Sequence, residues 1–197
     1  MLLPFLFPMK RAILILILSL LLPLGWALAQ KKKKKKEPEL HMMTLDSLGS
    51  QYKGLPYSDF RFTTLDGKTY TAGNTRGKVV YLNFWFEACV PCHIEFDALN
   101  RLYDSLKNDT SVVFAALTFE TVEQLPVIIA KEKLRYPVAS LSKDECARLI
   151  FDVGYPTSIV IDKMGNIALY ETGGFLQKEK AEAFIFNKLL PQIKALK

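Results

Sequence analysis

The sequence predicts an α/β domain with a central mixed β-sheet flanked by helices. Continuous apolar runs of strand length, such as 79–85 and 112–117, alternate with segments whose apolar residues recur at helical spacing. Toward the end of the chain, two short extended runs and an amphipathic segment complete the pattern. In sheets of this class, active sites lie at the carboxyl ends of the strands.

An additional β-hairpin is predicted at the N-terminal side of the domain. Residues 60–63 alternate apolar and polar side chains, Leu65-Asp66-Gly67-Lys68 contains an Asp-Gly turn, and 69–71 continue the extended pattern. The run 79–85 is then the first strand of the main sheet, because it is apolar and rich in β-branched and aromatic residues.

The later elements follow from the same patterns. The other predicted strands are short runs bounded by turn residues, at 112–117, 136–139, 158–161 and 167–170. The predicted helices show apolar residues at helical spacing and lie at about 92–106, 121–133, 143–151 and 177–197, with Phe184, Leu189, Leu190 and Ile193 as core residues of the last. Pro126 should lie in the first turns of its helix, whereas Pro191 should end or kink the last helix, because proline has no backbone N–H.

The chemistry is concentrated at Cys89-Val90-Pro91-Cys92, where the first main strand turns into a helix. A helix N-terminus carries unpaired N–H groups and partial positive charge, which stabilise a thiolate and lower the pKa of a cysteine. Two cysteines separated by two residues can also close a small disulfide with little rearrangement. The segment is therefore predicted to be a redox-active dithiol.

Two other interpretations of the cysteines are open at this point. A zinc site would need further ligands, but beyond the motif and His93 the sequence has only Cys146 and His41, so no metal is expected. Cys89-Val90-Pro91-Cys92-His93 also matches the c-type haem attachment pattern. Met164, the candidate second haem ligand, lies in a predicted exposed turn, which disfavours haem, and we expect no cofactor.

Five motifs together resemble the thioredoxin superfamily, and within it the exported TlpA/ResA-like thiol–disulfide oxidoreductases. The motifs are Leu65-Asp66-Gly67-Lys68, Gly77-Lys78-Val79-Val80, the Cys-x-Pro-Cys motif after Asn83-Phe84-Trp85, the acid Glu95, and Gly154-Tyr155-Pro156-Thr157 before a strand. The resemblance covers roughly residues 54–193. It implies a thioredoxin fold with the hairpin of 60–71 added at its N-terminal side.

The resemblance also implies roles for individual residues. Cys89 would be the exposed nucleophile and Cys92 the buried resolving thiol, the two forming a redox-active disulfide. Pro156 would be a cis-proline facing this pair. Tyr155, Pro156 and Trp85 would bind the substrate.

Glu95 is a further catalytic candidate. It lies one helical turn beyond Cys92, near enough to take its proton, and Asn83 stands where thioredoxin itself has a buried aspartate. The alternative is an exposed first-turn glutamate that the helix dipole favours.

The chain departs from the family pattern next to the motif. Ala88 replaces the tryptophan that commonly precedes the first cysteine, and Glu87 adds a carboxylate that would raise the pKa of the thiol if it pointed inward. A peroxiredoxin-like activity is the alternative enzyme class, but the Pro-x-x-x-Thr-x-x-Cys pattern is absent around Cys89.

The N-terminus predicts export. Lys10 and Arg11 precede the apolar run 12–24, and Ala27-Leu28-Ala29 fits a signal-peptide cleavage site. Residues 1–29 are therefore a predicted signal peptide, or an uncleaved anchor, since the six lysines at 31–36 oppose translocation. Residues 30–51 form a predicted Lys-rich linker and 52–197 the thioredoxin-like domain.

Charge and location indicate the partners. From Glu37 onward the chain has 18 lysines and arginines against 20 aspartates and glutamates, a net charge of about −2, so no nucleic-acid-binding surface is predicted. We expect disulfide-containing protein substrates in the periplasm or at the outer face of the cytoplasmic membrane. A membrane electron donor would re-reduce the dithiol, membrane anchoring is an option, and cytochrome c maturation is one process that the resemblance suggests.

Overall fold

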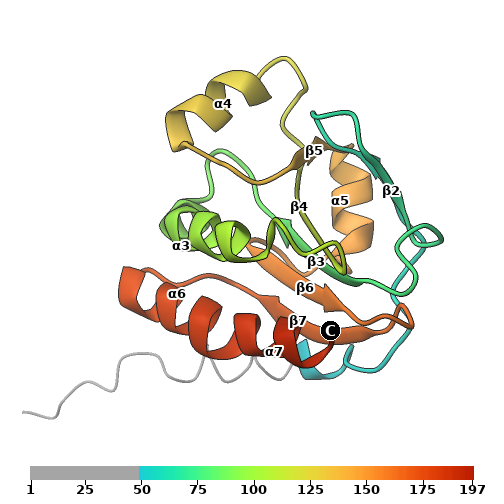
Figure 1. The fold of residues 1–197 in the computed structure, drawn as a ribbon. Helices are drawn as coiled ribbons and strands as arrows, with labels where there is room; N and C mark the ends of the chain where they lie inside the picture. Colours follow the sequence, from blue (N-terminus) through green and yellow to red (C-terminus); the bar gives the residue numbers. More distant parts are fainter. Residues whose placement is uncertain (1–48) are drawn as a thin grey trace, which may run out of the picture. The chain divides into compact units, whose positions relative to one another are not determined.

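A computed structural model describes residues 49–197, and the predicted signal peptide and most of the linker lie outside this range. The main sheet has five strands in the order β5-β4-β3-β6-β7 (Figure 1). Neighbouring strands are parallel in β3–β4 and β4–β5 and antiparallel in β3–β6 and β6–β7, so the sheet is mixed, as predicted. The strands are β3 (Val79–Phe84), β4 (Val112–Thr118), β5 (Val138–Ser140), β6 (Thr157–Ile161) and β7 (Ile167–Thr172).

The central strand β3 is buried along its whole length because the sheet is covered on both faces. Residues of α3, α4 and the C-terminal helices pack with one face of the sheet. The N-terminal hairpin and α5 cover the other (Figure 1). The helices are α3 (Val90–Leu106), α4 (Leu125–Glu132), α5 (Lys143–Leu149), α6 (Lys178–Phe184), η1 (Ile185–Leu189) and α7 (Leu190–Ala195).

The predicted hairpin is confirmed as β1 (Arg61–Thr63) paired antiparallel with β2 (Thr69–Thr71). It joins the rest of the domain through Phe62, which is buried, and through a hydrogen bond from the Leu65 N–H to the Val138 carbonyl. The hairpin therefore extends the cover of the sheet on the α5 side.

Helix α4 begins later than the sequence pattern predicts. The backbone N–H groups of Gln124 and Leu125 both donate to the Thr121 carbonyl, so 121–124 form a turn before the helix starts at Leu125. Pro126 lies in the first turn of the shortened helix, where the missing proline N–H costs nothing. The prediction of a helix from residue 121 was therefore wrong by one turn.

Pro191 does not end the C-terminal helix, which was one of the two outcomes predicted for it. The helix passes through a π-helical segment, η1, in which the Leu190 N–H donates to the Ile185 carbonyl five residues earlier. This wider turn directly precedes Pro191, which then occupies the first turn of α7. Of the predicted core residues, Phe184, Leu189 and Ile193 are buried, and Leu190 packs against the core only in part.

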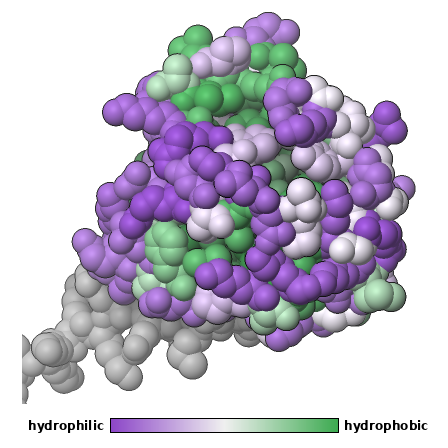
Figure 2. Space-filling view, viewed as in Figure 1, coloured by the Kyte–Doolittle hydropathy of each residue, from purple (hydrophilic) through white to green (hydrophobic). Residues whose placement is uncertain are grey.

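Helix α4 carries apolar residues on its outer side. Figure 2 shows hydrophobic side chains at the top of the molecule, over α4, where Val127 is exposed. Its opposite side contributes Leu125 and Ile128 to the core. Within residues 49–197, no helix has both the length and the apolar character needed to cross a membrane.

Candidate active site

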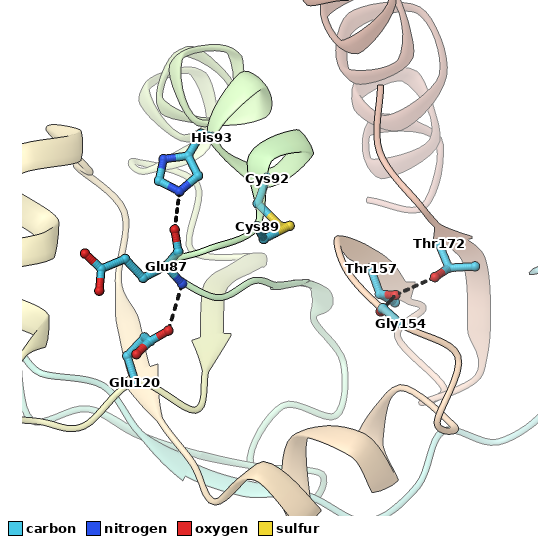
Figure 3. The surroundings of a disulfide bond; sticks show 8 residues. All are labelled: Glu87, Cys89, Cys92, His93, Glu120, Gly154, Thr157 and Thr172. Atoms are coloured by element: carbon cyan, nitrogen blue, oxygen red, sulfur yellow. Dashed lines mark hydrogen bonds between the residues drawn. A yellow bond between two sulfur atoms is a disulfide. The ribbon is translucent and has the colours of Figure 1, made fainter. Parts of the chain in front are cut away.

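Cys89 and Cys92 form a disulfide at the junction between β3 and α3 (Figure 3). Cys89 is the N-cap residue of α3, and its carbonyl accepts the N–H groups of Cys92 and His93, which closes the first turn of the helix. No acidic side chain lies in that first turn to oppose a thiolate. The sequence placed this pair correctly, because an apolar strand followed by helical spacing locates the junction.

Both cysteines are buried in the disulfide form. The exposed fraction of Cys89 is 4% and that of Cys92 is 1%, so the prediction that Cys89 is exposed was wrong for this state. The backbone of Gly174, in the loop after β7, lies against Pro91 of the motif and against Pro156. This contact brings the β7–α6 loop up to the Cys-x-Pro-Cys motif and to the cis-proline.

Replacing Gly174 with alanine should therefore disturb the site. An added Cβ would lie 2.6 Å from Pro91 Cβ and 2.8 Å from Pro156 Cγ, and neither proline ring can move aside easily. We expect Gly174→Ala to displace the loop and to destabilise the protein by about 1–3 kcal/mol, as overpacking does. Urea denaturation measures the loss. Gly73→Ala is the matched control, because its new Cβ would meet nothing closer than 3.7 Å.

The Tyr155–Pro156 peptide bond is cis, as the resemblance implies. Pro156 is buried, and Tyr155 is half-buried. Thr157, the next residue, donates from Oγ1 to the Gly154 carbonyl at 2.6 Å and lies 2.9 Å from Thr172 Oγ1 (Figure 3). These hydrogen bonds tie the cis-proline segment to the end of β7.

Trp85 does not lie where a substrate could reach its side chain. The indole is fully buried and meets the Phe96 ring edge-on, with the ring centroids 5.3 Å apart. The prediction of Trp85 as a substrate-binding residue was therefore wrong for its side chain. Trp85 instead belongs to the core that supports the dithiol.

An aromatic cluster that the sequence analysis missed lies beside the cis-proline. The rings of Phe86, Phe119 and Tyr155 have centroids 5.3 to 5.7 Å apart, and all three side chains are half-buried. This cluster supplies aromatic surface near the motif although Ala88 replaces the usual tryptophan. Tyr155 was already a candidate from the resemblance, and Phe86 could have been suspected because it is three residues before Cys89. Phe119 could not, because it comes from the loop after the neighbouring strand β4.

Glu95 is buried on α3, with an exposed fraction of 3%. Burial, and secondarily the negative charge of Glu171, raises the pKa of its carboxyl group from an ordinary value of 4.5 to about 8. The alternative of an exposed first-turn glutamate was therefore wrong. Asn83 is buried on β3 and contributes no charge.

The Glu87 carboxylate points away from the disulfide (Figure 3). It lies 3.5 Å from Lys131 Nζ of α4 and is partly exposed. Glu87 was expected to raise the pKa of the thiol only if its carboxylate pointed inward, so this effect on the pKa is not expected in the observed orientation.

Cys146 and His93, the remaining candidate residues, do not form a metal or haem site. Cys146 is buried on α5, and burial raises the pKa of its thiol to about 12. Among the described residues, no group of three potential metal ligands comes together. Both ring nitrogens of His93 are engaged by Glu87 and Glu132, which disfavours His93 as a haem ligand.

A mixed sheet with a Cys-x-Pro-Cys disulfide at the start of α3 and a cis-proline beside it defines a thioredoxin-fold thiol–disulfide oxidoreductase. A family model described as the AhpC/TSA family matches residues 54–170. The chain belongs to this family of the thioredoxin superfamily.

Individual relatives agree with this assignment. The chain is 32% identical over 133 residues to the thiol-disulfide oxidoreductase ResA of Bacillus thuringiensis subsp. konkukian, covering 68% of this chain and 76% of that protein. It is 29% identical to the thioredoxin-like protein YneN of Bacillus subtilis, over 64% of this chain and 75% of the relative.

Solved structures show the same fold. A Chlorobium tepidum protein assigned as a thiol:disulfide interchange protein, DsbE, superposes with a TM-score of 0.60 at 28% identity. The match covers 73% of this chain and 96% of that one. StoA from Bacillus subtilis superposes with a TM-score of 0.53 at 25% identity, over 66% and 98% of the two chains. The prediction of a ResA-like oxidoreductase with a thioredoxin fold is confirmed.

Proposed function

We propose that this protein reduces disulfides in other proteins outside the cytoplasm, with Cys89 as the nucleophile and Cys92 as the resolving thiol. The observation that carries the proposal is the Cys89–Cys92 disulfide at the N-terminus of α3, with the buried acid Glu95 one turn further along the same helix. The similarity to ResA supports it.

The reaction starts from the reduced dithiol. The Cys89 thiolate attacks one sulfur of the substrate disulfide, so that a mixed disulfide forms and the other substrate sulfur leaves as a thiolate. The Cys92 thiolate then attacks Cys89 of the mixed disulfide. This step releases the second substrate thiolate and leaves the Cys89–Cys92 disulfide, so two electrons have moved to the substrate.

Glu95 assists the second step in this proposal. A carboxyl group whose pKa lies near 8 holds its proton at neutral pH yet can exchange it readily, which suits proton transfer with a thiol. The helix places it one turn from Cys92. Tyr155 and Pro156, with the aromatic cluster of Phe86, Phe119 and Tyr155, would bind the extended substrate segment around the attacked disulfide.

Each turnover oxidises the dithiol, so an electron donor has to re-reduce it. Outside the cytoplasm this donor would be a membrane protein, and the predicted export signal or anchor would bring the domain to the same side. Cytochrome c maturation is one process that requires such a reductase.

The reduction potential of the Cys89–Cys92 pair tests the direction of electron flow. We expect a value near that of thioredoxin, about −270 mV, for a reductase, whereas a value near −120 mV would indicate an oxidase. Equilibration of the exported form with glutathione and dithiothreitol buffers gives this value. The Cys92→Ala variant, which cannot resolve mixed disulfides, should then trap substrate proteins at Cys89.

A further inference from the structure

His93 links three segments around the dithiol. It lies on the first turn of α3, immediately after Cys92, and its Nε2 is 2.5 Å from the Glu87 carbonyl oxygen (Figure 3). Its Nδ1 is 3.0 Å from Oε2 of Glu132 on α4. The imidazole ring therefore connects the helix that carries Cys92, the loop that leads to Cys89, and α4.

The partners of His93 determine where its protons lie. A backbone carbonyl oxygen can only accept a hydrogen bond, so the Nε2 atom must carry a proton and donate it to Glu87. The second contact needs one more proton, either on Nδ1 or on the Glu132 carboxyl group. Glu132 thus fixes the orientation of the ring, and the ring fixes the Glu87 carbonyl.

Residue Glu87 is held from both sides of its backbone. Its carbonyl accepts from His93, and its N–H donates to Oε1 of Glu120 at 2.7 Å (Figure 3). Glu120 comes from the loop between β4 and α4. Because Glu87 is two residues before Cys89, these two hydrogen bonds restrict the segment that carries the nucleophile. Lys131 on α4 also lies near this network, with its Nζ 3.5 Å from a carboxylate oxygen of Glu87 and 3.6 Å from a carboxylate oxygen of Glu132.

The N-terminus of α3 has no side-chain cap of its own. Cys89 occupies the N-cap position, and no side chain donates or accepts there. A cysteine side chain that takes part in the reaction cannot also serve as a permanent cap. The segment before the helix is therefore held by other groups, and the two hydrogen bonds to the Glu87 backbone hold it.

We propose that His93 is a positioning residue, which through its hydrogen bond to the Glu87 carbonyl holds the Cys89 thiolate in its reactive position. Glu132 acts through His93 by orienting the ring. This inference rests on the proposed role of Cys89 as the nucleophile.

The test compares the reactivity of the Cys89 thiol in His93 variants. In a Cys92→Ala background, iodoacetamide alkylation of reduced Cys89 measures its nucleophilicity without any protein substrate. We expect His93→Leu, which keeps the bulk but removes the donor, to slow alkylation at neutral pH about ten-fold. A Cys89 thiolate that shifts away from the N-terminus of α3 loses the partial positive charge that stabilises it, so a smaller fraction of the thiol is ionised. His93→Gln, which can still donate to the Glu87 carbonyl, should recover most of the rate. A merely structural role would not give this rescue.

Two further variants sharpen the result. Arg101→Leu is the matched control. Arg101 lies on α3, like His93, but its ion pair is with Glu182 of α6 and does not involve the Glu87 loop, so the alkylation rate should be unchanged. Glu132→Gln should slow alkylation less than His93→Leu does. Adding Glu132→Gln to His93→Leu should cause no further loss, because the two residues act through one contact.

Full reactivity in His93→Leu, or effects of His93→Leu and Glu132→Gln that simply add, would overturn the proposal. If instead the proposed function were wrong, disulfide reduction would persist in Cys89→Ser while these alkylation rates still reported on His93.

Discussion

Cys89→Ser is expected to lower disulfide reduction by at least about a thousand-fold while leaving the fold intact. A serine hydroxyl is a far weaker nucleophile than a thiolate, and the helix N-terminus cannot ionise it at neutral pH. Cys89 also supplies the N-cap backbone of α3, which serine, a preferred N-cap residue, preserves. The loss should therefore appear in the rate of insulin reduction and not in the circular dichroism spectrum.

The third cysteine provides the control for this experiment. Cys146 is fully buried on α5, and its thiol has a raised pKa, so it cannot replace Cys89 as a nucleophile. Cys146→Ala should keep the wild-type rate of insulin reduction despite a small loss of stability from the vacated volume. Retained activity in Cys89→Ser would mean that the nucleophile lies elsewhere.

Glu95→Gln is expected to slow turnover and, at alkaline pH, to stabilise the protein. Glutamine cannot transfer a proton, so the rate of substrate reduction at pH 7 should fall about 100-fold, within the usual range for a general acid or base. The effect on stability follows from the buried position of the group, which favours the neutral side chain.

The sign of the pH effect follows from the two pKa values of Glu95. The folded protein holds the proton up to a pKa of about 8, whereas the unfolded chain releases it near 4.5. The contribution of the neutral carboxyl group to the free energy of unfolding is therefore complete below about pH 4.5. It is lost as the pH rises toward 8, by up to about 1.4 kcal/mol per pH unit. Glu95→Gln removes this titration and should flatten the dependence.

Urea denaturation of the oxidised protein between pH 5 and 8 measures both curves. The wild type and Glu95→Gln should differ most at pH 8, with the variant the more stable. The matched control is Asp97→Asn, which changes a carboxylate on the same helix that is exposed and paired with Lys178. Parallel curves for the wild type and Glu95→Gln would contradict the assignment of Glu95 as a buried acid with a raised pKa.

Local patterns in the sequence predicted most secondary structure. The strands β3, β4 and β6 and the helix α3 are within about two residues of their expected bounds, because continuous apolar runs and helical spacing are properties of neighbouring residues. The errors occurred where longer-range hydrogen bonding decides. At Pro191, the π-helical segment η1 accommodates a residue that local rules treat as a helix terminator.

The sequence by itself determined where the dithiol lies, at the end of the first main strand and the start of its helix, and which family the chain resembles. Only the tertiary structure decided what surrounds it. Packing of α6 and η1 on α3 brings distant parts of the chain over the helix that carries Glu95, whose burial raises the pKa of its carboxyl group. Gly174 lies against Pro91 of the Cys-x-Pro-Cys motif, and Phe119 and Glu132 reach the site from the loop after β4 and from α4. These contacts join residues far apart in the chain, so no pattern of neighbours along the sequence records them.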